Sequence, residues 1–178
     1  MLYAFGFDRV GVVVGDLYFV NPDPLDGQEG PEQGVRLEVR LFEQGELRGS
    51  IYSARPIAVD RPIWRADLLE SVDNPGSLDR AHHHPRFRGW EPGPRHFVDE
   101  MGADPPGWVA DRLRDLPGLL AEAGVPAEAV GPTDAADLRA SVPEIVEALR
   151  RLLEGVHEGR LARPPSDSGL DSARLSWL

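Results

Sequence analysis

The sequence predicts an α+β fold, with an antiparallel sheet of about five strands in the first half of the chain and helices in the second half that pack on one face of the sheet. Apolar and polar residues alternate within the first 70 residues, which is the period of half-buried strands, whereas apolar residues beyond position 107 recur at helical spacing. A run of strands followed by a run of helices is typical of α+β domains rather than of alternating α/β folds.

We expect one domain followed by a short tail. The expected divisions are a single domain over 1–160, made of a strand-rich part (1–70), a His/Arg loop (71–96) and a helical part (97–160), and a flexible tail with an apolar end (161–178). No internal repeat is present that would suggest a solenoid or a propeller.

Three stretches of the first half have the pattern of strands. Residues 10–14 and 17–20 flank a Gly-Asp pair that suits a tight hairpin turn. Residues 35–43 alternate between valine or leucine and arginine or glutamate, as half-buried antiparallel strands do. Residues 21–34 are rich in proline, glycine and acids, which predicts a mobile loop between them.

Two further strands are expected before the helices begin. The first covers residues 50–59 and is broken or bulged at Pro56, because proline lacks a backbone donor. The second covers residues 63–69. Together with the earlier stretches they would complete the predicted sheet.

Two segments of the second half have helical spacing. Residues 107–123 place apolar residues near one face, and Pro117 is expected to break or kink that helix. Ser141 and Glu144 have the spacing of a capping box, from which an apolar stripe runs onward, and Thr133 is expected to cap a short preceding helix. This stripe is expected to pack on the protein's own sheet; the alternative is that helix 142–156 joins a homodimer or a partner protein.

Composition and charge exclude several classes of function. Nineteen basic residues, all of them arginine, stand against 30 acidic residues, which gives a formal net charge of −11. Such a field repels duplex DNA and anionic membranes. The absence of cysteine excludes disulfides, thiolate metal sites and a cysteine nucleophile. The first residues lack the basic segment of a signal peptide and no apolar run is long enough to span a bilayer, so a soluble cytoplasmic protein is expected.

One segment gathers most of the imidazole and much of the positive charge. Four of the five histidines lie between positions 82 and 96, and within residues 80–96 four arginines stand against one glutamate, a local charge of +3. We expect this segment to attract a phosphate-bearing ligand or RNA while the rest of the chain repels bulk polyanions. The expected anion-binding residues are Arg80, Arg86, Arg88 and Arg95.

Three interpretations of the histidines are open. In the first, His82 and His84 lie on one side of an extended segment and act as general acid and base, while arginine binds the charge that develops on phosphorus. In the second, they bind a divalent metal ion with a third ligand taken from His96, Asp79 or Glu91. In the third, the histidines are surface or satisfied interior residues and the arginines balance nearby acids.

The strand that leads into this loop carries its own charged pair. Trp64 and Ala66 share one face of the strand, and Arg65 and Asp67 share the other. Arg65 and Asp67 belong either to the histidine site or to a solvated face opposite a core tryptophan, and the solvated face is the expected one.

The chain resembles the TumE-like toxins of toxin–antitoxin systems over positions 50–96. The resemblance rests on Trp64-Arg65-Ala66-Asp67, then Asp73-Asn74, then His82-His83-His84-Pro85. The insertion between Asn74 and His82 departs from the compact family motif, and the acidic charge is unusual for a toxin directed at RNA. The resemblance implies RNA-directed toxicity, with His82, His84 and Arg65 as the matching positions.

The first interpretation predicts a His/Arg anion-binding site that belongs to a toxin-like ribonuclease independent of metal and of any other cofactor. One alternative is a non-enzymatic interaction or regulatory module that oligomerises or binds a partner through its C-terminal helix and tail. The second alternative is a His-ligated divalent-metal protein.

Overall fold

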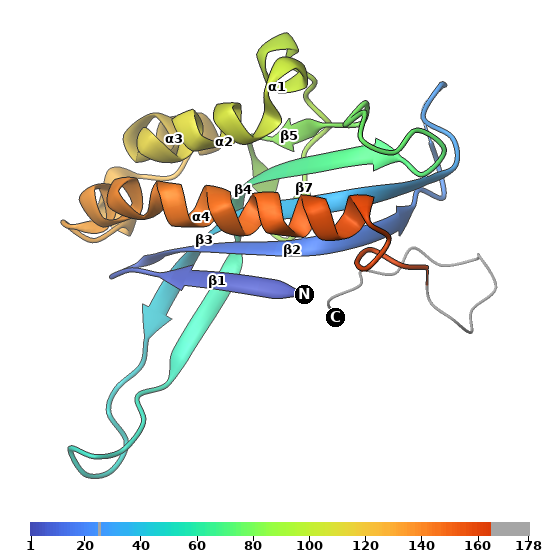
Figure 1. Ribbon diagram of the computed structural model, residues 1–178. Helices are drawn as coiled ribbons and strands as arrows, with labels where there is room; N and C mark the ends of the chain where they lie inside the picture. The colour runs from blue at the N-terminus through green and yellow to red at the C-terminus, as the bar shows by residue number, and fades with distance from the viewer. Residues whose placement is uncertain (25, 165–178) are drawn as a thin grey trace.

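Five antiparallel strands form one sheet in chain order in the computed structural model, which describes residues 1–24 and 26–164 (Figure 1). The strands are β1 (Leu2–Gly6), β2 (Val10–Val20), β3 (Pro31–Gln44), β4 (Ile57–Ser71) and β5 (His82–His84). A small two-stranded hairpin follows, made of β6 (Phe87–Arg88) and β7 (Glu91–Pro92). Each connection joins neighbouring antiparallel strands, so the sheet is a simple meander.

The helices all follow the strands and cover one face of the sheet, which confirms the predicted α+β class (Figure 1). They are α1 (Asp99–Ala103), α2 (Pro105–Arg114), α3 (Leu116–Ala123), a 3₁₀ turn (Ala127–Ala129) and α4 (Asp134–His157). Within the described ranges, no helix is both long enough and apolar enough to cross a membrane.

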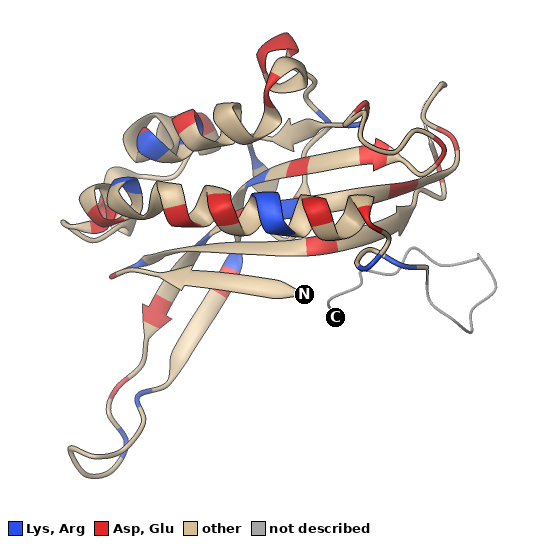
Figure 2. Ribbon diagram, in the orientation of Figure 1, with Lys and Arg blue, Asp and Glu red and all other residues tan. Residues whose placement is uncertain are grey.

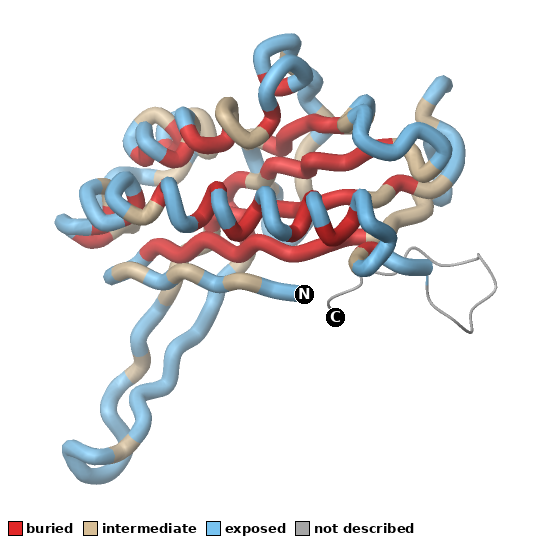
Figure 3. The backbone as a smooth tube through the Cα atoms, in the orientation of Figure 1, coloured by how far each residue is buried: buried red, intermediate tan, exposed pale blue. Residues whose placement is uncertain are grey.

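An apolar core fills the space between the helices and the sheet (Figure 3). Alternate residues of β2, β3 and β4 point into it, and Trp64 is its largest fully buried side chain. The stripe of α4 is buried against these strands: Val142, Ile145, Leu149 and Leu152 are all 0% exposed. The expected packing of this helix on the protein's own sheet is confirmed, so the stripe is not free to act as a seam for a second chain.

β2 is one uninterrupted strand, so the hairpin turn expected at Gly15-Asp16 is wrong. Gly15 pairs with Leu2 of β1 on one side and with Arg36 of β3 on the other, which keeps the backbone extended. The carboxylate of Asp16 also accepts a hydrogen bond from the backbone N–H of Ala162 at 2.8 Å. Pairing on both edges outweighs the local turn preference, and β1 itself lies in a segment that we did not predict as a strand.

β4 is likewise a single strand, Ile57–Ser71, where two were expected. Pro62 lies within it opposite Arg40, at a place where the β3–β4 register shifts. The bulge accommodates the missing backbone donor of the proline without ending the strand. Residues 50–56, predicted as strand, instead belong to the connection between β3 and β4.

The helices differ from prediction at one boundary. The break expected near Pro117 is confirmed: α2 ends at Arg114, and Asp115 caps α3 by accepting from the N–H of Gly118 at 3.1 Å. The separate helix expected from Ser141 is wrong, because α4 begins at Asp134 and continues through Pro143. Thr133 stands at the N-cap of this helix, as expected, but its side chain makes no capping hydrogen bond. Burial of the long stripe sustains the helix across a residue that, by local preference, would end it.

The segment predicted as a His/Arg loop contains the fifth strand of the sheet. His82, His83 and His84 pair with Asp67, Ala66 and Arg65 of β4, and His83 also forms a bridge with His96. Residues 165–178 of the predicted tail lie outside the described residues.

We predict that Leu149→Ala lowers the free energy of unfolding by about 2–5 kcal/mol, because it opens a cavity where α4 meets the sheet. Arg151→Ala, which removes an exposed pair with Glu147, should cost only about 0.3–0.5 kcal/mol. Urea denaturation followed by circular dichroism measures both. Equal effects of the two variants would contradict the packing of α4 described above.

Candidate functional site

The face of the sheet turned away from the helices carries a block of polar side chains. Alternation along each strand sends them to this face, opposite the apolar core. The strand register sets them in two rows, Arg36–Asp67–His82 and Glu38–Arg65–His84.

This polar face is buried. Glu38 and Asp67 are each 1% exposed, and His82 and His84 are 1% and 6% exposed. Residues 85–97, which we call the strap, supply part of the cover: Arg65 lies 5.0 Å over the ring of Phe87 in that segment. The solvated face expected for Arg65 and Asp67 is therefore wrong, because the strap and the neighbouring side chains exclude water from it.

Three side-chain atoms meet at the centre of this face. Nε2 of His82 lies 3.2 Å from Nε2 of His84. Oδ2 of Asp67 lies 3.4 Å from the His82 nitrogen and 3.5 Å from the His84 nitrogen. We call Asp67, His82 and His84 the triad. In the described part of the chain it is the one group of three histidine or carboxylate side chains whose ligand atoms lie close enough together to share a metal ion.

The backbone fixes the tautomer of each triad histidine. Nδ1 of His82 lies 2.7 Å from the carbonyl oxygen of Arg80, and Nδ1 of His84 lies 2.7 Å from that of Gly93 in the strap. A carbonyl oxygen only accepts, so each Nδ1 carries a hydrogen and donates it. The two Nε2 atoms, which face each other and Oδ2 of Asp67, are then the ring nitrogens left to accept a proton or to bind a metal ion.

Arg36 holds the carboxylate of the triad in place. Its Nε donates to Oδ1 of Asp67 at 2.7 Å and its Nη2 donates to Oδ2 at 3.1 Å. Burial would raise the pKa of Asp67, but the Arg36 guanidinium, followed by the two imidazoles, holds that pKa well below its usual range. Asp67 is therefore an ionised carboxylate, with Oδ2 facing the histidines.

A second ion-pair network lies beside the triad. Nε of Arg65 donates to Oε1 of Glu38 at 2.9 Å, and Nε of Arg40 donates to Oε2 at 2.8 Å. Burial, and then repulsion from Arg36, lowers the pKa of Arg65. Three guanidiniums against two carboxylates leave this region with one excess positive charge before the imidazoles are counted.

His83 points to the opposite face and belongs to the apolar core. Its ring lies 5.0 Å from that of Trp108, 5.6 Å from His96 and 6.1 Å from Trp64. Burial, and then the nearby His96, lowers the pKa of His83 to about 4. The neutral His83 ring and the triad thus lie on opposite faces of the sheet.

None of the three expected third metal ligands lies in the triad. His96 pairs with His83 along the backbone, and its ring is on the helix side with that residue. Asp79 instead accepts hydrogen bonds from the backbone of Ser71 and the hydroxyl of Ser77. Glu91 lies in β7. The third side chain of the cluster is Asp67, from the strand opposite His82.

The four expected anion-binding arginines lie in separate places. Arg95 is paired with Glu32 at 2.7 Å, and Arg80 donates to the carbonyl of Gly27. Arg86 and Arg88 line one cavity of about 610 Å³, together with His96 and three prolines. The structure therefore brings together His82, His84 and Arg65 of the expected site, and places the other arginines apart from them.

Sequence reasoning missed Arg36 as part of the site. The alternation of β3 assigns Arg36 and Glu38 to the polar side of a half-buried strand, where solvent is the ordinary neighbour. The local pattern contains no signal that this side is covered as well. The useful signal was the matching pattern in β4, where Arg65 and Asp67 alternate in the same way.

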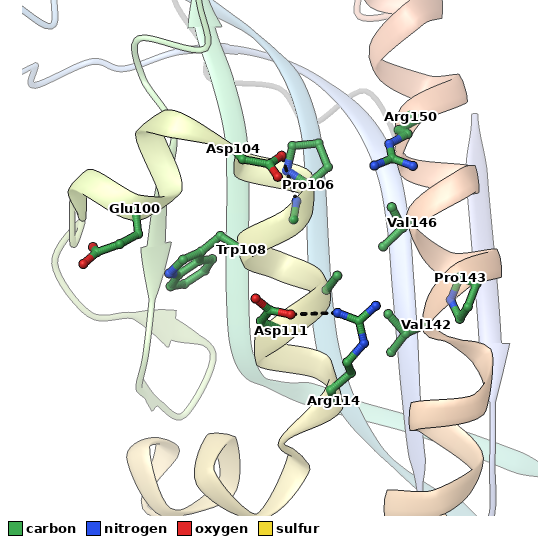
Figure 4. A pocket seen from close by; sticks show the side chains of 12 residues that line it. Glu100, Asp104, Pro106, Trp108, Asp111, Arg114, Val142, Pro143, Val146 and Arg150 are labelled. Carbon is green, nitrogen blue, oxygen red and sulfur yellow. Dashed lines mark hydrogen bonds and ion pairs between the residues drawn. The ribbon is translucent and has the colours of Figure 1, made fainter.

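A further cleft lies between α2 and α4 (Figure 4). It measures about 530 Å³, and Val142 and Val146 of α4 face the side of α2 that carries Arg114. Asp111 is paired with Arg114 within α2. None of the residues expected from the sequence to bind or to catalyse lines this cleft.

No family model, no curated protein and no solved structure matches this chain.

We predict that the stability of the metal-free protein falls as pH decreases from about 6.5 to about 4, in part because of His83. The pKa of His83 is lower in the folded state than in the unfolded state, so within this pH window the unfolded chain binds a proton that the folded chain does not bind. Lowering the pH therefore favours the unfolded state. Denaturant unfolding in the presence of a chelator should show a weaker dependence for His83→Gln.

Proposed function

We propose that the protein binds one divalent transition-metal ion of the zinc type through Oδ2 of Asp67 and Nε2 of His82 and His84. The observation that carries this proposal is the convergence of three electron pairs within 3.5 Å of one another in a buried site. A single proton can occupy only one of the three gaps between these atoms, whereas a cation at the centre satisfies all of them at once.

The size of the triangle suits tetrahedral coordination. Metal–nitrogen distances of about 2.0–2.1 Å at tetrahedral angles separate the ligand atoms by about 3.3–3.4 Å, whereas right-angled coordination separates them by about 2.8–3.0 Å. The edges in this protein are 3.2, 3.4 and 3.5 Å. They correspond to three corners of a tetrahedron.

The surroundings of the triad also suit a metal ion. Metal-binding histidines usually donate their other ring N–H to a carbonyl or a carboxylate, which is the role of the carbonyls of Arg80 and Gly93. Arg36 orients the ligating carboxylate in the same manner. The ligands are thus held by groups that need not move when the ion binds.

The number of ligands supports a hydrolytic role. Structural zinc sites usually take four protein ligands, whereas three protein ligands leave one position for a water molecule that the ion activates for hydrolysis. The triad supplies three such atoms in the described part of the chain. We therefore assign the centre to metal-dependent hydrolysis. For this reaction the strap would have to move, so that a substrate can reach the ion.

Zinc titration of the metal-free protein tests the site. We predict one bound ion per chain by elemental analysis, and a stabilisation of about 2.7 kcal/mol when free zinc is a hundredfold above its dissociation constant. His82→Gln and His84→Gln should each weaken binding by more than the about 10–100-fold typical of outer-shell changes.

The control is His96→Gln, which removes a histidine from the opposite face and should bind zinc like the wild type. Folding of each variant is checked by circular dichroism before the titration. Zinc binding that persists unchanged in the His82→Gln, His84→Gln double variant would show that the triad is not the site.

A second candidate is metal-independent acid–base cleavage of RNA by His82 and His84 with Arg65. Two observations favour it: the residues that carry the resemblance to TumE-like toxins pair in register on β4 and β5, and the excess positive charge around the triad opposes a divalent cation. A proton shared between the imidazoles would then prepare one as acid and the other as base. Because both rings are buried, RNA would have to displace the strap.

Cleavage of RNA in vitro, or toxicity on expression, distinguishes the two candidates. His82→Ala with His84→Ala should abolish activity in either case. We expect activity to be lost with a chelator and recovered with zinc. Activity that is unaffected by the chelator but lost in the double variant would support the acid–base mechanism instead.

A further inference from the structure

The ends of β3 and β4 form a hairpin that projects from the body of the molecule (Figure 1). We call residues 43–59 the arm. Its base is anchored, because the ring of Phe42 packs so closely on Gly11 that a Cβ there would lie 2.0 Å from it. Within the arm, the N–H of Gly45 donates to the carbonyl of Pro56 at 2.8 Å. The arm therefore leaves the body from a fixed root.

Most of the arm is exposed (Figure 3), and it carries several large apolar side chains. Tyr52 is 91% exposed and Ile51 is 82% exposed. Of the nine large hydrophobic side chains exposed within the described ranges, five belong to the arm. A two-stranded hairpin alone in water is marginally stable, and clustered exposed apolar residues mark an interaction surface.

The arm carries charged residues of both signs (Figure 2). Arg48 lies toward the tip, whereas the guanidinium of Arg55 donates to Oε1 of Gln44 near the root at 3.2 Å. The arm as a whole is neutral, because these two arginines stand against Glu43 and Glu46. The root borders a cleft of about 540 Å³ whose lining includes Asp8, Glu43 and Asp60 against the single Arg9. In the described part of the chain these three carboxylates make no ion pair.

We propose that the arm exchanges with the arm of a second copy of this chain, so that the tip of each copy enters the acidic cleft at the root of the other. An antiparallel arrangement around a two-fold axis brings each Arg48 to the carboxylates of the partner's root and stacks the apolar side chains of the two arms. Because of the two-fold axis, each copy contributes its tip to one tip-to-root contact and its root to the other.

Charge favours a second copy over an unrelated acidic or basic partner. The chain carries a net charge of −11 and the arm carries none, so the arm is a surface on which two copies meet without like-charge repulsion. The arm projects from the body of the molecule (Figure 1), so the acidic bodies stay apart while the arms pair.

Light scattering coupled to size-exclusion chromatography tests the exchange on the full chain. The wild type should double in mass as concentration rises, and Tyr52→Asp with Ile51→Asp should remain monomeric. Because these positions are exposed, the variants should keep the wild-type circular dichroism and melting temperature. The charge change Arg151→Glu on α4 serves as the control and should leave the dimer intact.

A pair of charge-reversed proteins makes the test specific for tip-to-root contact. Arg48→Glu makes the tip acidic, and Glu43→Arg with Asp60→Arg makes the root basic. Each protein alone should be monomeric, since its tip and root carry like charge, whereas an equimolar mixture should form a heterodimer in which both contacts are restored. A monomeric wild type, or tip-reversed protein that still dimerises, would overturn the proposal.

Discussion

The buried ion pair between Arg36 and Asp67 is the interaction on which the polar half of this structure depends. It lies in the middle of a sheet face that the strap covers, where an unpaired charge would be strongly destabilising, by about 3–5 kcal/mol. The pair lets a carboxylate remain ionised away from water and turns one of its oxygens toward the two imidazoles. The position of Asp67 then gives His82 and His84 a shared partner. Without Arg36, the buried carboxylate of Asp67 would lose its guanidinium partner.

The sheet separates two interiors of opposite character. On the helix side, alternating apolar residues of β2, β3 and β4 pack against α4 and supply the hydrophobic stabilisation. On the other side, ion pairs and hydrogen bonds to backbone carbonyls replace water around buried charges. β5 takes part in both: His83 enters the apolar core, and its neighbours His82 and His84 enter the polar layer. Three consecutive histidines thus have two different environments, and the outer two lie in the cluster with Asp67.

The triad and the arm occupy different parts of the same two strands. β3 and β4 hold the ion pairs of the polar layer near residues 36–38 and 65–67, and farther along they leave the body as the arm. A bulge at Pro62 and the Phe42–Gly11 contact lie between the two regions. The proposed metal site and the proposed arm exchange therefore rest on separate contacts, and variants at the arm tip should leave the triad unchanged.

The sequence by itself determined the fold class, the order of strands before helices, the burial of the α4 stripe and the break before Pro117, because these follow from the period of apolar residues and from local backbone chemistry. It also indicated that His82 and His84 share a side of an extended segment. Only the tertiary structure decided that Gly15 and Asp16 continue a strand, that Ser141 lies inside a helix, and that Asp67 rather than His96 completes the cluster. Those outcomes depend on strand register and on the strap, which helps to bury a sheet face whose alternating polar residues are typical of a solvent-exposed face. Contacts between residues far apart in the chain decide both, and the composition of either segment alone carries no record of them.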